Sequence, residues 1–305
     1  MANKNVNEED SRFEGIHGVH KIKIGDVLIM IVLVLLCLTC VMPFVHLLAK
    51  SLSSNTAVLS KSVYFWPKGF NINAYRSLFL DGQMTHAMIY SVELTIIFTI
   101  LGMVVCTCAA YPLSKKRLKG RGVISILLML TMYFSAGLIP SYLLMKQLNL
   151  LNTMWVLILP LIFSPYNMLI MKSFFQSSIP DSLEESAFLD GATNFTILFR
   201  IVLPLSKPII ATLSLFYAVG RWNSYADAKY YITRKALQPI QYILSNMVKS
   251  AADSAASLSE AAQVTSTPEV YQAAAVMFAT IPIMCIYPFL QKYFVKGVMV
   301  GAVKG

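Results

Sequence analysis

Long apolar runs separated by short polar segments set the pattern of this chain. An α-helix rises about 1.5 Å per residue, so about 20 apolar residues in a row are needed to cross the hydrocarbon core of a bilayer. Runs of that length, or close to it, predict membrane-spanning helices over residues 27–49, 94–113, 122–145, 153–171, 208–226 and 271–291. The first run is too long and begins too late for the apolar part of a cleaved signal peptide, so we expect it to persist as a span.

The composition agrees with lipid as the main solvent of the chain. Hydrophobic residues make up 56% of the 305 residues and charged residues only 13%, and the mean hydropathy is +0.62. In soluble domains about a quarter of all residues are charged, so a soluble globular protein is excluded. We therefore expect an all-α polytopic membrane protein, with a cytoplasmic segment over residues 1–26, one six-span domain over residues 27–295 and a cytoplasmic tail over residues 296–305.

Basic residues indicate which side of the membrane each loop occupies. The segment SKKRLKGR, residues 114–121, carries five Lys and Arg residues in eight positions. Such loops resist translocation, so this loop is expected in the cytoplasm, and alternation places residues 176–207 and both termini there too. The net charge of +10 then signals topology and attraction to lipid headgroups. No nucleic-acid partner is expected, because no basic helix or stacking module stands apart from the spans.

Residues 176–207 form a polar loop with two helix signals. Ser182 and Glu185 have the spacing of a capping box and follow Pro180, which predicts that a short helix starts there. Asp190-Gly191 predicts its end. A second helix is expected to begin at Thr193 or Asn194.

The second helix of the loop is expected to close at Pro204, before Pro208 opens the next span. Its apolar residues recur at helical spacing and predict a single stripe made of Phe195, Leu198, Phe199 and Val202. Two short helices bent at a glycine, one with an apolar face, are typical of a surface that docks on another protein. The alternative is an amphipathic helix lying in the lipid headgroups.

The same loop resembles the cytoplasmic EAA loop of permease subunits in binding-protein-dependent ABC importers. The resemblance rests on Glu185-Ser186-Ala187, on Asp190-Gly191-Ala192 two residues later, and on Ile201-x-Leu203-Pro204 after a spacer. Ser186 stands where the family usually has Ala. The resemblance implies that the loop forms coupling helices that seat in a cleft of an ATPase subunit. The residues expected to take part are Glu184, Glu185, Ala187, Asp190, Gly191, Ala192, Ile201, Leu203 and Pro204.

The resemblance covers nearly the whole chain and looks like the maltose-type branch of carbohydrate permeases. The run LNTMWVLILP, the pair Trp222-Asn223 and the ending QKYFVKGVMVGAVKG carry it. The stretch from Phe216 to Gly220 is similar to the subgroup associated with aldouronates and other complex oligosaccharides, although those relatives tend to have His where this chain has Arg221. The resemblance implies the type I ABC importer fold, with six transmembrane helices and a cytoplasmic helix-turn-helix coupling loop in the plasma membrane. It also implies a second homologous permease subunit, two ATP-binding cassette ATPase subunits, an extracellular solute-binding protein and a sugar substrate.

Arg221 interrupts the fifth predicted span about 20 Å from its cytoplasmic end. A charge at that depth is expected to face a cavity or a partner. One reading is a substrate path in which aromatic faces, an amide and a cation contact a carboxylated sugar; its residues are Tyr217, Arg221, Trp222, Asn223 and Tyr225. The other readings are an ion pair with Glu93 or Asp227, or a side chain that reaches the outer interface.

Catalytic chemistry is not indicated. The sequence has no Walker A, G-x-S-x-G or HExxH pattern, and Cys37-x-x-Cys40 has no matching cluster to complete a metal site. We therefore expect no catalytic residue, metal or cofactor in this chain. ATP hydrolysis is expected only in partner subunits. The outer segment KSAADSAASLSEAAQV is expected to be helical and to face the binding protein or to be a surface decoration. The rival functions are an ion-coupled secondary transporter, a membrane-bound enzyme and an ABC permease for a non-sugar solute.

Overall fold

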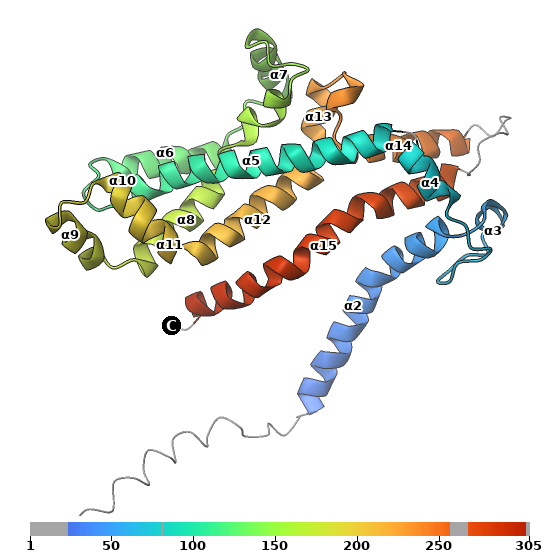
Figure 1. The fold of residues 1–305 in the computed structure, drawn as a ribbon, viewed down its shortest axis with the longest axis horizontal. Helices are drawn as coiled ribbons and strands as arrows, with labels where there is room; N and C mark the ends of the chain where they lie inside the picture. The colour runs from blue at the N-terminus through green and yellow to red at the C-terminus, as the bar shows by residue number, and fades with distance from the viewer. Residues whose placement is uncertain (1–23, 81, 257–267, 303–305) are drawn as a thin grey trace, which may run out of the picture.

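The computed structural model describes residues 24–80, 82–256 and 268–302, with side chains described for residues 24–80, 82–250 and 268–285. Within these residues every regular element is helical and no strand occurs, which confirms the all-α prediction (Figure 1). The N-terminal segment before residue 24 and the end of the Ala- and Ser-rich outer segment, residues 257–267, lie outside the described residues.

Helices of very different lengths follow one another along the chain. The longer ones are α2 (Ile24–Ser51), α5 (Gln83–Ser114), α12 (Lys207–Asn223), α14 (Ile240–Ala256) and α15 (Pro268–Ala302). The shorter ones are α3 (Asn55–Leu59), α4 (Asn73–Leu80), α6 (Arg121–Tyr133), α7 (Leu138–Gln147), α8 (Pro165–Ser178), α9 (Asp181–Leu189), α10 (Asn194–Ile197), α11 (Leu203–Leu205) and α13 (Ala226–Tyr231). Three elements are short 3-10 helices, namely η2 (Met154–Leu157), η3 (Leu159–Leu161) and η5 (Lys235–Leu237), and η4 (Leu198–Val202) is a π-helical turn.

Two of the predicted spans are single helices that are long and apolar enough to cross a membrane, namely α2 and α5. Counting each bent pair of helices as one span raises the number found among the described residues to as many as five. Helix α15, 35 residues long, covers the last predicted run and continues beyond residue 295, where we expected the tail to begin. The candidate membrane spans thus include both single helices and bent pairs of helices.

The third and fourth predicted spans are wrong as continuous helices. Helices α6 and α7 meet at 111°, because the chain is extended at Phe134 and Gly137, the N-cap of α7, has a positive φ of 84°. The run over residues 153–171 is bent by 51° between η3 and α8. There Ser164 caps α8 by accepting a hydrogen bond from the Asn167 amide at 3.3 Å, and Pro165 occupies the first turn.

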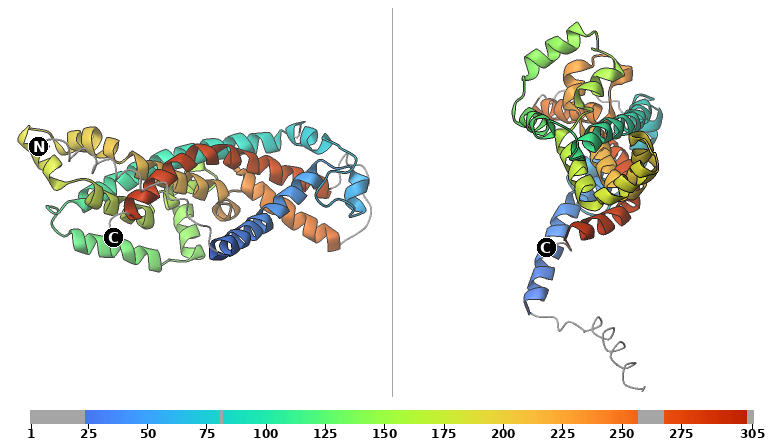
Figure 2. Two further views of the ribbon diagram at one scale, coloured as in Figure 1. Left: turned by 90° about the horizontal axis from the view of Figure 1, so that it is seen from below. Right: turned by 90° about the vertical axis from the view of Figure 1, so that its left-hand side faces the viewer.

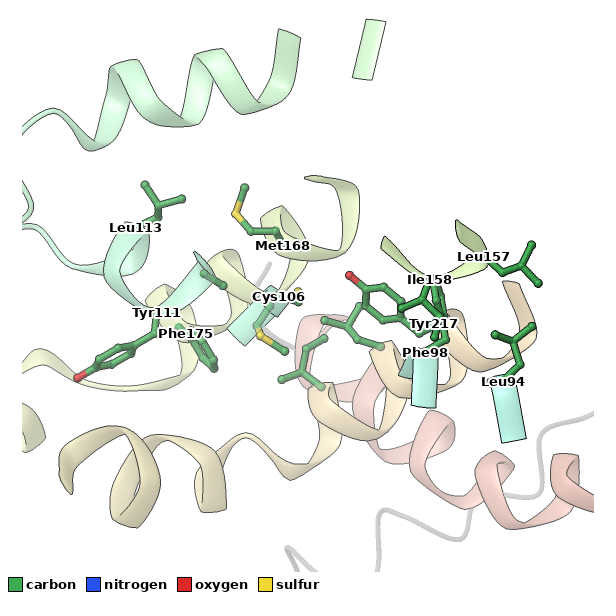
Figure 3. Close-up of a cluster of buried hydrophobic side chains, with 14 of the residues drawn as sticks. Leu94, Phe98, Cys106, Tyr111, Leu113, Leu157, Ile158, Met168, Phe175 and Tyr217 are labelled. Atoms are coloured by element: carbon green, nitrogen blue, oxygen red, sulfur yellow. The ribbon is translucent and has the colours of Figure 1, made fainter. Parts of the chain in front are cut away.

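The body of the protein is a bundle in which α5 packs against α8 and α12, and α15 packs against α12 and α2. Figure 3 shows the core between them, where Tyr217 of α12 lies beside Phe98 of α5 and Ile158. Gly102 of α5 makes room for this ring, because a Cβ atom there would stand 2.8 Å from Cδ1 of Tyr217. A second core at the other end joins α4, α5, α14 and α15 and includes Leu78 and Ile240.

Helices α2 and α7 project from opposite sides of this bundle (Figure 2). Residues 24–45 of α2 are exposed over their whole length, and most of the exposed side chains are large and apolar. Within a single chain, the long apolar stretch over residues 24–45 of α2 is thus left uncovered, and lipid or other subunits must cover it.

Candidate functional site

The loop between α8 and α12 contains the two short helices that the sequence predicts. The first, α9, begins two residues earlier than a helix capped by Ser182 would, because Pro180 is its N-cap and no side-chain cap bond forms there. The predicted capping box is therefore wrong. The hydroxyl of Ser186 instead donates to the Ser182 carbonyl at 2.9 Å, one turn back along the helix.

Asp190 and Gly191 end α9 as predicted. Gly191 has a φ of 80°, its amide donates to the Phe188 carbonyl at 3.0 Å, and the Ala192 amide donates to the Ala187 carbonyl at 2.9 Å. These two bonds are the Schellman pattern, which needs a left-handed residue at the position of Gly191. The glycine therefore sets the angle between the two helices of the loop.

Thr193 opens the second helix by accepting a hydrogen bond from the Thr196 amide at 3.3 Å. The predicted single stripe is wrong, because Leu198 and Val202 are buried while Phe195 and Phe199 are 74% and 63% exposed.

The reason is that Ile197, Leu198 and Val202 join the apolar core, which fixes the opposite face toward solvent. The helix also widens to a π-helical turn over Leu198–Val202 and does not close at Pro204. It continues to Leu205 and then meets α12 at 84°.

The basic residues 115–117, directly after α5, contact this loop. Lys115 forms an ion pair with Glu184 of α9, with side-chain exposures of 11% and 8%, and Lys116 pairs with Asp181 at 2.8 Å on the surface. The hydrogen bond from Lys116 holds the pKa of the Asp181 carboxyl below its usual value.

Arg117 extends the support to the second helix. It donates to the Asn194 side chain, and its guanidinium lies 4.4 Å from the Phe188 ring centroid. These contacts link residues 115–117 to both helices of the loop. The sequence pattern of residues 114–121 indicated only the topology and not these contacts with the loop. The acidic residues Asp181 and Glu184 were the signal that could have predicted them.

The residues expected to couple fall into two groups. Glu185, Asp190, Gly191 and Pro204 are exposed. Glu184 is buried against Lys115, and the remaining four, which are Ala187, Ala192, Ile201 and Leu203, are half-buried and pack against the core. Leu189, which no sequence pattern singled out, is 90% exposed between the two helices. The free surface of the loop thus combines carboxylates with large apolar side chains.

Arg221 is buried, with 3% of its surface exposed, and is held by a bidentate ion pair. Its Nη1 and Nη2 donate to the two carboxylate oxygens of Asp227 at 2.5 and 3.0 Å, and Nη1 also donates to the Leu157 carbonyl at 2.8 Å. The Ser224 hydroxyl donates to the same carboxylate at 2.9 Å. Of the readings open from the sequence, the structure shows the pair with Asp227, which ties the end of α12 to α13 and η2.

The other four residues of the expected substrate path do not gather around Arg221. Tyr217 is buried in the core beside α5, and Trp222 is buried in the second core. Asn223 and Tyr225 are exposed. A substrate path over these residues stays a prediction, and of the five residues only Asn223 and Tyr225 are exposed in this structure.

Among the described residues, no group of three or more His, Cys, Asp or Glu side chains is placed to hold a metal ion. Cys106 is buried, whereas Cys37, Cys40, Cys108 and Cys285 are exposed, and none of these thiols is in a disulfide.

The chain belongs to the family of binding-protein-dependent transport system inner membrane components, whose model matches residues 94–300. It is a membrane-embedded permease subunit with the type I ABC importer fold. It is 42% identical to the polygalacturonan/rhamnogalacturonan transport system permease protein YtcP of Bacillus subtilis (strain 168), over 93% of this chain and 100% of that one. It is 39% identical to Protein LplC of the same organism, over 95% and 99%.

A solved structure shows the same fold. A crystal structure of a bacterial ABC transporter involved in the import of the acidic polysaccharide alginate contains a chain that matches with a TM-score of 0.81 and 27% identity, over 91% of this chain and 99% of that one. The likeness includes nearly every element described above, and it confirms the fold class that the EAA-like loop implied.

Proposed function

We propose that this chain is one transmembrane subunit of an ATP-driven importer that moves an acidic oligosaccharide across the cytoplasmic membrane by alternating access. The full-length match to a permease named for polygalacturonan and rhamnogalacturonan carries the proposal. Polygalacturonan and alginate are both polymers of carboxylated sugars, and the alginate importer is the solved relative. A carboxylated sugar is therefore the substrate class that these likenesses favour.

The coupling loop supplies the contact with the motor. Leu189 and Phe199 are large apolar side chains exposed to water, and Glu185 lies exposed one turn before Leu189. Exposed apolar side chains on a loop that is otherwise polar are typical of a protein interface. In the proposed complex this surface seats on an ATPase subunit in the cytoplasm, on the same side as both termini.

The complex that we propose contains this chain, a second homologous permease, two ATPase subunits and an extracellular solute-binding protein. ATP binding closes the ATPase pair, and the coupling loop then moves as a rigid body. This drives transport only if the ATPase pair binds ATP more tightly in one conformation of the permeases than in the other. Arg221 serves the architecture of the path in this scheme, because its charge is already neutralised by Asp227.

Copurification and uptake test the proposal together. A tagged chain should retain an ATPase subunit and a second permease, and membrane vesicles loaded with ATP should take up oligogalacturonides when the binding protein is added. A neutral galacto-oligosaccharide of equal length is the matched control for the substrate class. Uptake driven by a proton gradient without ATP would instead show a secondary transporter.

A further inference from the structure

A pocket of about 430 Å³ lies where the end of α5 meets the second helix of the coupling loop. Lys115, Arg117 and Asn194 form its polar side. Cys108, Pro112 and Leu198 are among its apolar walls. The pocket thus joins a basic edge to an apolar interior.

The charge at the basic edge is only partly neutralised. Lys115 is paired with Glu184, but Arg117 contacts the neutral amide of Asn194 and the ring of Phe188. Among the described residues, no carboxylate lies within ion-pair distance of Arg117. A guanidinium has five N–H donors in a planar fork, so Arg117 retains donors suited to a phosphate group.

An exposed apolar stripe of α5 leads into this pocket. Ile96, Ile100 and Val104 are 54%, 58% and 54% exposed, and each lies four residues before the next. Cys108 continues the spacing and is both exposed and part of the pocket wall. An apolar track along a spanning helix that ends at a cation matches the shape of a phospholipid lying against the protein.

We propose that this pocket binds the headgroup of an anionic phospholipid from the inner leaflet, with an acyl chain along the α5 stripe. A lipid fits better than a free phosphate, because most of the pocket wall is apolar and shares Cys108 with the stripe. Anionic lipids of the inner leaflet also attract basic segments near the membrane surface. The same Arg117 holds Asn194 of α10, so a bound lipid stabilises the position of the coupling loop.

Native mass spectrometry of the purified transporter tests the proposal directly. The full complex is equilibrated with mixed micelles of phosphatidylcholine and phosphatidylglycerol, and the retained lipids are counted. We expect preferential retention of phosphatidylglycerol, reduced about tenfold by Arg117→Gln through loss of a charge-assisted contact. Arg117→Lys should restore retention. Lys119→Gln is the matched control, because it removes a charge from the same loop outside the pocket.

A second variant tests the apolar half of the site without touching its charges. Cys108→Trp fills the wall of the pocket and should lower retention of phosphatidylglycerol while the basic edge remains intact. Equal retention in wild type, Arg117→Gln and Cys108→Trp would overturn the proposal. Displacement of the lipid by inorganic phosphate would overturn it in favour of a free anion. Retention of phosphatidylglycerol only after the ATPase subunits are removed from the complex would assign the pocket to the protein interface.

Discussion

Lys115 at the end of α5 forms a buried ion pair with Glu184 of α9, although the two residues are 69 positions apart in the chain. The pair connects the coupling loop to a spanning helix that does not adjoin it in sequence. Helix α5 contributes a large share of the core with α8 and α12. In the proposed mechanism, this pair gives the motion of the loop a side-chain route to α5, in addition to the covalent links at either end of the loop.

Breaking this pair should loosen the loop. Removing one partner of a buried ion pair leaves an uncompensated charge and typically costs about 3–5 kcal/mol. We expect Glu184→Gln and Lys115→Gln each to lower the thermal stability of the purified transporter and to speed proteolysis of residues 176–207. The exchanged pair Lys115→Glu with Glu184→Lys should recover much of the loss, and no recovery would argue against a direct pair.

The neighbouring pair of Lys116 and Asp181 offers a matched control on the surface. Exposed pairs contribute little, so Asp181→Asn should leave thermal stability near neutral pH unchanged. Because the pKa of the folded Asp181 carboxyl is lowered, any contribution is present above its unfolded pKa and is lost as the pH falls through the folded value. Salt should weaken the pair as well. If Asp181→Asn lowered thermal stability as much as Glu184→Gln, burial would not explain the difference expected between the two ion pairs.

Gly191 permits a prediction that separates backbone strain from crowding. A Cβ atom at this position would meet no heavy atom within 4 Å, so a side chain fits, but the φ of 80° costs most residues about 1–2 kcal/mol. We expect Gly191→Val to insert normally in the membrane and to uncouple ATP hydrolysis from uptake. Gly191→Asn is the matched control, because Asn tolerates this region of φ and ψ, and it should transport nearly as well as wild type.

The turn at Gly191 could be predicted because its signal is local: a glycine after a short helix is the residue that a left-handed cap requires. The apolar runs were also local signals: α2 and α5 are long and apolar enough to span, as two of the runs predict, whereas the runs over residues 122–145 and 153–171 are bent by 111° and 51°. The pairing of Lys115 with Glu184 could not be predicted in this way, because it depends on how α5 and α9 pack. The division of Phe195, Leu198, Phe199 and Val202 between solvent and core depends on packing for the same reason.

Gly102 and Tyr217 make the packing of α5 against α12 testable. An added Cβ at Gly102 would overlap the tyrosine ring at 2.8 Å, and overpacking of a core typically costs about 1–3 kcal/mol. Gly102→Ala should therefore lower the thermal stability of the transporter. Gly122→Ala in α6 is the matched control, because nothing lies within 4 Å of a Cβ there, and it should be neutral or slightly stabilising. Equal effects of the two changes would contradict the close approach.

Substitutions of Arg221 and Asp227 distinguish a structural role of Arg221 from contact with the substrate. The pair is bidentate and its side chains are 1% and 10% exposed, so Arg221→Met leaves a buried carboxylate uncompensated and should lower stability by about 3–5 kcal/mol. Asp227→Asn should give a similar loss, and both should reduce uptake of acidic and neutral oligosaccharides equally. Thermal unfolding of the purified complex measures the first effect and uptake of the two sugars the second. Normal stability with a selective loss of the acidic sugar would instead place the Arg221 charge in the substrate path.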